Sequence, residues 1–168
     1  MPISHVEGKE WTYDHAVKAQ PSKIYDVGPG VGTYSDLLRS STKAHWVGIE
    51  VWEPYIEEYA LRSKYDEVVR QDARDYPFGY DRNSLILFGD VIEHMDEFDS
   101  KQLLRLAKQA SKYVLVSIPI MHCEQGAVNG NPYEAHVRHW GFEEMHELMD
   151  YCDSWRGDVL ACYWWERK

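Results

Sequence analysis

Apolar runs of strand character alternate along this chain with stretches whose apolar positions recur at helical spacing. The strand-like runs, each rich in β-branched or aromatic residues, are 23–26, 42–50, 67–73, 83–94 and 113–118. The range 83–94 includes the segment that directly follows the strand. The helical stretches between and after them are 11–19, 33–39, 54–62, 99–110 and 142–152. Two short runs, 154–157 and 159–165, end the pattern. This alternation predicts a largely parallel sheet with helices on both faces.

Several positions sharpen the predicted boundaries. Pro21 closes the first helix, and Pro54 opens the third because proline is tolerated in a first helical turn. Asp99 and Ser100 are expected to cap the fourth helix, whose apolar stripe is Leu103, Leu104, Ala107 and Ala110. The nearly continuous apolar run 113–118 is typical of a central parallel strand.

Two segments lack a clear period. Residues 1–10 are polar and are expected to form a loose arm. The arm is expected to continue into a helix over the ligand site, so that residues 1–20 form an N-terminal arm and helix. Residues 119–139 form a long loop, and a loop of about twenty residues in a small domain is more often functional than idle.

Three glycines at alternate positions follow the first predicted strand. Gly28, Gly30 and Gly32 come two residues after Asp26, and a helix begins at once behind them. Glycine tolerates positive φ and lets backbone N–H groups approach a ligand closely. A strand, a glycine loop and a helix in this order form the nucleotide-type site of an open α/β sheet. The dinucleotide fingerprint requires a further glycine at its sixth position, where this chain has Thr33.

Acidic residues recur at the ends of the later strands. Glu50 lies roughly twenty residues beyond the glycine loop, where a carboxylate grips ribose hydroxyls. Asp72 follows the third strand, and the fourth runs into Gly89-Asp90-Val-Ile-Glu93-His94. Over residues 23–95, these four motifs in this order resemble those of class I S-adenosylmethionine (SAM)-dependent methyltransferases.

The resemblance implies a three-layer Rossmann-like fold with a mostly parallel seven-stranded sheet, whose last strand runs antiparallel. It also implies SAM as cofactor and S-adenosylhomocysteine (SAH) as product. Asp26 is expected to hold the glycine loop by accepting backbone N–H bonds, Glu50 to bind the ribose, and Asp72 to lie near the adenine amino group. The cofactor-binding residues expected on this basis are Asp26, Gly28, Gly30, Gly32, Glu50, Val51, Asp72, Ala73, Gly89 and Asp90.

His94 is the candidate catalytic residue. An imidazole with a pKa near 6.5 can remove a proton from a hydroxyl or amine as the methyl group is transferred. The alternative is a histidine that only orders its loop through Asp90 or Glu93. Methyl transfer also proceeds by positioning and desolvation alone, so a base is not always required. The chain has Phe-Gly-Asp at the fourth strand rather than the Asn/Asp-Pro-Pro-Tyr of DNA amino-methyltransferases, which argues against an exocyclic base nitrogen as target.

The 119–139 loop holds polar groups among aromatic ones, which suits a small polar acceptor. It lies after the fifth strand, where this fold keeps substrate-covering elements. The expected substrate residues are His122, Tyr133, Glu134, His136 and Trp140. A metal site is an alternative, since His136 and His139 are three residues apart, but no recognised ligand spacing is present and none is predicted.

Size, charge and cysteine usage narrow the class further. With 168 residues, the chain is expected to be one domain, 1–168. Its formal charge of −10 disfavours a nucleic-acid partner, because phosphate binding draws on lysine and arginine. Three cysteines without a Cys-x-x-Cys pair, no apolar signal segment and no run able to span a bilayer indicate a soluble, cytoplasmic protein.

The function expected from these observations is methyl transfer from SAM to an oxygen or nitrogen nucleophile of a small-molecule acceptor. A nucleic-acid or protein acceptor is a further option within this class. Two alternatives belong to other classes: an enzyme that cleaves SAM itself, as a lyase or hydrolase, and a non-catalytic SAM-binding partner or sensor. The sequence leaves the oligomeric state open.

Overall fold

The computed structural model describes residues 4–168 and contains one seven-stranded sheet with the order β3-β2-β1-β4-β5-β7-β6. All pairings from β3 to β5 are parallel, whereas β7 is antiparallel to both of its neighbours. The strands are β1 (Lys23–Val27), β2 (His45–Glu50), β3 (Glu67–Arg70), β4 (Ser84–Gly89), β5 (Tyr113–Pro119), β6 (Asp153–Arg156) and β7 (Leu160–Glu166). This sheet confirms the predicted fold class, including the antiparallel last strand.

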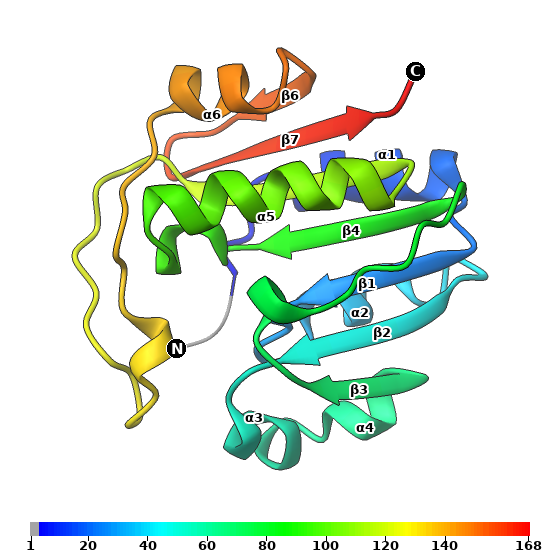
Figure 1. The fold of residues 1–168 in the computed structure, drawn as a ribbon, viewed down its shortest axis with the longest axis horizontal. Helices are drawn as coiled ribbons and strands as arrows, with labels where there is room; N and C mark the ends of the chain where they lie inside the picture. Colours follow the sequence, from blue (N-terminus) through cyan, green and yellow to red (C-terminus); the bar gives the residue numbers. More distant parts are fainter. Residues whose placement is uncertain (1–3) are drawn as a thin grey trace.

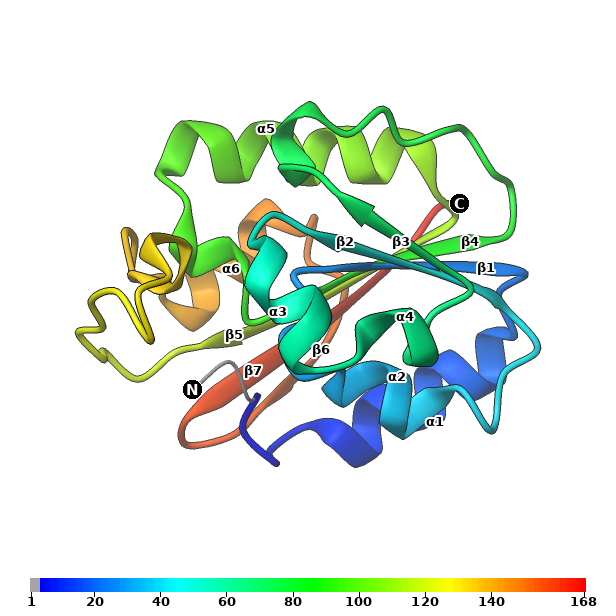
Figure 2. The same cartoon turned by 90° about the horizontal axis from the view of Figure 1, so that it is seen from below.

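Helices cover both faces of the sheet and make three layers (Figure 2). They are α1 (Lys9–Ala19), α2 (Thr33–Leu38), α3 (Glu53–Glu58), α4 (Leu61–Lys64), α5 (Glu97–Ala110) and α6 (Phe142–Leu148), with 3₁₀ turns η1 (Ala73–Asp75), η2 (Ile92–His94) and η3 (Pro132–Glu134). Within residues 4–168, no helix is long and apolar enough to cross a membrane.

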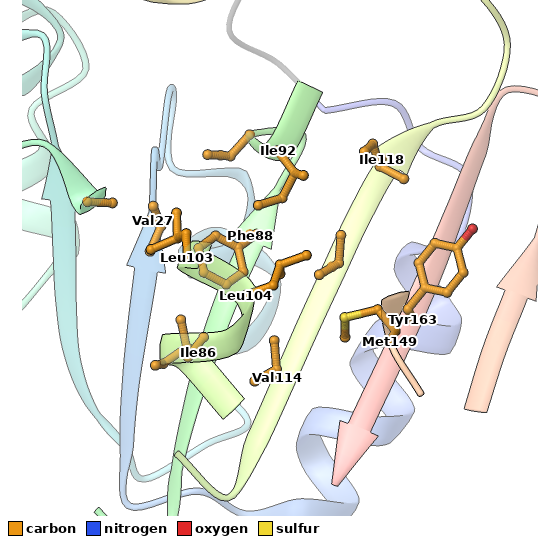
Figure 3. Packing of buried hydrophobic residues seen from close by; sticks show 14 of the residues in the cluster. Val27, Ile86, Phe88, Ile92, Leu103, Leu104, Val114, Ile118, Met149 and Tyr163 are labelled. Atoms are coloured by element: carbon orange, nitrogen blue, oxygen red, sulfur yellow. The ribbon is translucent and has the colours of Figure 1, made fainter. Parts of the chain in front are cut away.

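The core has one apolar cluster on each face of the sheet. On the α5 face, Leu103, Leu104 and Met149 pack with side chains from the central strands, among them Phe88 and Val114 (Figure 3). On the opposite face, side chains of α1, α2 and α4 cover a second cluster. The apolar stripe predicted for 99–110 is buried as expected, from Leu103 to Ala110.

Several predicted boundaries are wrong, for local reasons. The helix expected over 54–62 is two helices, because Ala60 adopts a left-handed φ of 50° between α3 and α4. Helix α5 begins before Asp99, since Asp96 is its N-cap and accepts a bond from the Asp99 N–H. Helix α1 confirms the helix predicted before Pro21, but it packs against a sheet face with α2 and does not cover the ligand site.

Strand order places the site. β1 lies between β2 and β4. The chain runs from β1 to β2 and β3 on one side and later forms β4 on the other side of β1. This reversal of strand order opens a crevice at the carboxyl ends of these strands. Figure 1 places the 119–139 segment, in yellow, along this same edge of the sheet. The backbone N–H groups of Val137 and Arg138 both donate to the Glu93 carbonyl oxygen, at 2.8 and 3.1 Å, and tie the segment to η2.

Candidate cofactor and acceptor site

A cavity of about 310 Å³ lies at the carboxyl ends of β1, β2 and β4. Its lining joins the glycine loop to the 119–139 segment. Of the residues predicted from the sequence, it includes Gly28, Gly30, Glu50, Val51, Asp72, Ala73, Gly89, Asp90, His94, Tyr133, Glu134 and His136. The cavity falls within the size range of small-ligand sites, about 300–1,000 Å³.

The glycine loop has backbone conformations that side chains would disturb. Gly28 and Gly30 have φ values of 61° and 53°, in the left-handed region that favours glycine. A Cβ at Gly28 would lie 2.7 Å from a Val91 methyl carbon. Gly32 does not line the cavity; it precedes α2, with its N–H donating to the Pro29 carbonyl oxygen at 2.7 Å.

Gly89, at the end of β4, keeps the cavity wall close-packed. A Cβ there would lie 2.2 Å from the Tyr34 ring. Tyr34 is buried under the glycine loop, and its hydroxyl accepts a hydrogen bond from the Lys9 ammonium group at 2.8 Å. The absence of a side chain at Gly89 therefore lets this ring reach the cavity floor.

Asp26 is buried beneath the glycine loop, with 1% of its surface exposed. Its carboxylate accepts a 2.6 Å bond from the Tyr65 hydroxyl, not the backbone N–H bonds expected from the sequence, and it does not line the cavity. Burial raises the pKa of Asp26 to about 7, against the opposing effects of the Tyr65 hydrogen bond and the Lys9 charge. The Asp26 side chain therefore connects β1 to Tyr65, at the end of α4.

Glu50, at the end of β2, presents a buried carboxyl group to the cavity. One oxygen accepts the Trp52 backbone N–H at 2.7 Å. Burial raises the pKa of Glu50 to about 7, and the nearby Glu134 carboxylate adds to this rise. The other carboxylate oxygen remains available to a ligand hydroxyl.

Asp72 is the N-cap of η1, and Arg74 already engages its carboxylate. The Arg74 guanidinium contacts both Asp72 oxygens, at 2.9 and 2.6 Å, and also Asp99 at 2.7 Å. These contacts hold the pKa of Asp72 below its usual value. Asp72 is therefore a fixed, charged group at the cavity wall beside Ala73.

Two predicted substrate residues lie outside the cavity. Trp140 is fully buried in the core cluster below α5 and α6, with the Arg138 guanidinium over its ring. His122 is exposed and contacts the ring of His139. Both stand in an aperiodic segment, where residue type alone does not tell a packing residue from a ligand contact.

Glu93 is a cavity residue that lies within a predicted motif but was not itself predicted as a site residue. Only 2% of Glu93 is exposed, and its Oε2 atom has no hydrogen-bond partner among residues 4–168. Burial, together with the Asp90 carboxylate, raises the pKa of Glu93 well above its usual value. Its place in Asp-x-x-Glu-His, directly after a strand, was the available signal.

His94 and His136 face each other across the same end of the cavity, with ring centroids 5.1 Å apart. Nδ1 of His94 lies 3.1 Å from the Ala135 carbonyl oxygen, and Nδ1 of His136 lies 2.8 Å from that of Cys123. Because a carbonyl oxygen only accepts, each Nδ1 donates its N–H, which in a neutral ring leaves Nε2 as the acceptor. Desolvation lowers the pKa of His94 and favours this neutral form.

The family model of the methyltransferase domain matches residues 25–114, which hold the glycine loop, Glu50, Asp72 and the Asp90–His94 motif. No curated protein sequence matches the chain.

Solved structures share the fold over nearly the whole chain. A Pyrococcus horikoshii OT3 protein is 19% identical, with a TM-score of 0.72 over 97% of this chain and 89% of its own. The 1,6-didemethyltoxoflavin-N1-methyltransferase of Burkholderia thailandensis, solved with its substrate and SAH, is 16% identical, with a TM-score of 0.71 over 96% of this chain and 77% of its own. A Nostoc punctiforme PCC 73102 protein is 15% identical, with a TM-score of 0.66; the match covers 93% of this chain and only 55% of that longer chain.

Proposed function

We propose that this chain, which belongs to the methyltransferase-domain family, transfers the methyl group of SAM to an oxygen or nitrogen atom of a small-molecule acceptor. The proposal rests on the observation that one continuous cavity is lined by both the glycine loop and the 119–139 segment. A donor at one end and an acceptor at the other then share one water-poor space, as a direct transfer between two molecules requires. In this proposal, residues 1–168 act as one domain.

The cofactor end of the cavity has the groups that SAM needs. Gly28 and Gly30 would lie against the methionine end, and the free Glu50 oxygen would accept a ribose hydroxyl. Val51, Asp72 and Ala73 would border the adenine. Asp26 and Gly32 would act indirectly, Asp26 by its bond to Tyr65 at the base of the site and Gly32 by preceding α2. When bound, SAM supplies a methyl carbon already activated by its sulfonium group.

The acceptor end is formed by Asp90, Tyr133, Glu134 and His136. Polar groups that converge in an apolar-walled cavity favour a small polar molecule. The formal charge of −10 argues in the same direction, since it disfavours the phosphate backbone of a nucleic acid. The toxoflavin-type substrate bound in the Burkholderia thailandensis structure is a small molecule in a protein of this fold.

His94 would serve as the proton acceptor if the acceptor must lose a proton. His94 lines the cavity, and its neutral ring keeps a lone pair on Nε2, which is the form a general base needs. Positioning and the exclusion of water by the 119–139 segment would supply much of the remaining rate enhancement.

Turnover with methyl-labelled SAM tests the proposal. The purified chain is incubated with panels of small hydroxyl and amine compounds and, separately, with RNA, DNA and protein, and the labelled products are identified by mass spectrometry. Label in a small molecule, together with SAH, is expected. Label only in a macromolecule would overturn the acceptor class, and loss of SAM without any methylated product would indicate a SAM-cleaving enzyme.

A further inference from the structure

We infer that Glu93, His94 and His136 form a binding site for a divalent transition-metal ion at the acceptor end of the cavity. One ligand atom from each of the three side chains lies within 4.8 Å of the other two. No metal was predicted from the sequence, because the 119–139 segment has no recognised ligand spacing; His136 lies 42 positions beyond His94.

The hydrogen bonds of the two histidines favour metal binding. Metal-ligating histidines usually donate their other ring N–H to a backbone carbonyl or a carboxylate, which fixes the ring and leaves the remaining nitrogen free for the metal. His94 does this at the Ala135 carbonyl and His136 at the Cys123 carbonyl. In the neutral rings, both Nε2 atoms are thereby left as acceptors. Packing of the two rings alone would not require such a free acceptor atom.

Glu93 provides an independent observation. Its Oε2 atom is buried and has no hydrogen-bond partner in the described part of the chain, at the acceptor end of the cavity. A buried polar atom without a partner is costly, and a bound metal ion would supply the missing partner. Asp90 and Glu134 line the same cavity, so further carboxyl groups stand near this site.

The donor set indicates the class of metal. Two imidazoles and one carboxylate suit Mn²⁺, Fe²⁺, Co²⁺ or Zn²⁺, whereas Mg²⁺ and Ca²⁺ prefer oxygen ligands. Ligand atoms bound at about 2.0–2.2 Å lie at most about 4.4 Å apart, so the three side chains would have to close slightly around the ion. His136 stands in the long loop and is only half-buried, which leaves it room to move.

An ion with three protein ligands keeps further coordination positions open. Here they would face the cavity, where an oxygen or nitrogen atom of the acceptor could bind and be held near the donor. In this role the inference rests on the proposed function and refines it. His94 would then be a metal ligand, with its Nε2 lone pair no longer available to act as a base.

Direct metal binding by the full chain is the test. Protein freed of metal with a chelator is titrated with Co²⁺, followed by its absorption bands, and with Mn²⁺, followed by electron paramagnetic resonance; Mg²⁺ is the comparison. One Co²⁺ or Mn²⁺ per chain is expected, with pulsed-resonance coupling to imidazole nitrogen in the Mn²⁺ form. Absence of stoichiometric binding, or of nitrogen coupling, would overturn the site.

Variants separate the site from accidental binding. Glu93→Gln and His136→Ala should each weaken Co²⁺ binding by at least about tenfold. His45→Asn, an exposed histidine at the far end of β2, should leave it unchanged. Unchanged affinity in both cavity variants would contradict the proposal; a role of His94 as base alone predicts that result. Should both variants fail to fold by circular dichroism, the nitrogen coupling in the unaltered protein decides.

Titration of the metal-free protein with SAH keeps the two proposals apart. If SAH binds and Co²⁺ does not, the metal site is wrong and the methyltransferase assignment stands. If Co²⁺ binds at the cavity and SAH does not, the cofactor assignment fails and the metal site stands.

Discussion

At the scale of single residues, the contribution of Glu50 follows from its burial. It is 4% exposed, one oxygen is used by the Trp52 N–H, and the other faces the cavity. In the proposed function, a carboxylate already held in this way needs no further ordering to accept a ribose hydroxyl. Hydrogen bonds to a charged group contribute more than neutral ones, about 1.5–3 kcal/mol.

Glu50→Gln should therefore weaken SAH binding by about 1–3 kcal/mol, or roughly five- to 150-fold, because the amide is a weaker acceptor. Titration calorimetry measures the change. Glu53→Gln is the matched control, since Glu53 is exposed and pairs with Arg70 outside the cavity. Equal SAH affinity in Glu50→Gln and the unaltered chain would remove Glu50 from the cofactor site.

Gly89→Ala should destabilise the protein by about 1–3 kcal/mol, because the new methyl group would overlap the Tyr34 ring in a close-packed region. Urea unfolding measures the change. Gly79→Ala, where a Cβ meets nothing within 4 Å, should be nearly neutral. If the two variants proved equally stable, the packing described around Gly89 would be wrong.

The sequence predicted residues whose role depends on local geometry and missed those that depend on distant partners. Gly28, Glu50 and Asp90 stand at fixed positions after strands, so their motifs alone placed them at the cavity. The partner of Asp26 is Tyr65, 39 residues away, which no local pattern reveals. His136 was predicted as a substrate residue, but its proximity to Glu93 was not, because the two meet only where the long loop returns to η2.

At the scale of elements, strands were easier to predict than helix ends. The apolar runs of β1, β4 and β5 are buried almost throughout, and a run of apolar residues in the sequence indicates such burial directly. The break between α3 and α4 depends on one left-handed residue, Ala60, whose side chain has no preference for that conformation. The 119–139 loop has no period in the sequence, and its η3 turn and its hydrogen bonds to Glu93 are tertiary features that no local pattern indicates.

Helix α5 yields a prediction at this scale. Asp96 caps it by accepting the Asp99 N–H at 2.8 Å, and α5 covers one core cluster. Asp96→Ala should lower the free energy of unfolding by about 1 kcal/mol, whereas Asp96→Asn, which retains an acceptor oxygen, should cost much less. Urea unfolding of both variants tests this; an equal loss in the two would mean that charge, and not capping, is what Asp96 contributes.

At the scale of the whole molecule, the acids beneath and beside the cofactor end couple stability to pH. Burial raises the pKa values of Asp26 and Glu50 to about 7, whereas unfolded-state values are near 4. Between about pH 4 and 7, the folded protein then binds more protons than the unfolded chain. Its free energy of unfolding must therefore fall as the pH rises through this window.

Ligand-free protein should accordingly be more stable to urea at pH 5.5 than at pH 7.5. Asp26→Asn should flatten this slope, because the amide does not titrate. Acids with lowered pKa values, such as Asp66 and Asp72, lose their contribution only as the pH falls below about 4, so they do not oppose the trend in this window. The lowered pKa of His94 does oppose it near pH 6, but the raised pKa values of Asp26, Glu50 and Glu93 outweigh this one group. A slope in Asp26→Asn equal to that of the unaltered chain would show that Asp26 is not its source.

The central claim is that this cavity binds SAM as methyl donor, and the most direct test is calorimetric titration of the full chain with SAM, SAH and NAD. Binding of SAM and SAH with dissociation constants of about micromolar order, and no heat from NAD, is the result expected from a glycine loop that ends in Thr33 and a carboxylate at Glu50. Binding of NAD alone, or of none of the three, would contradict it.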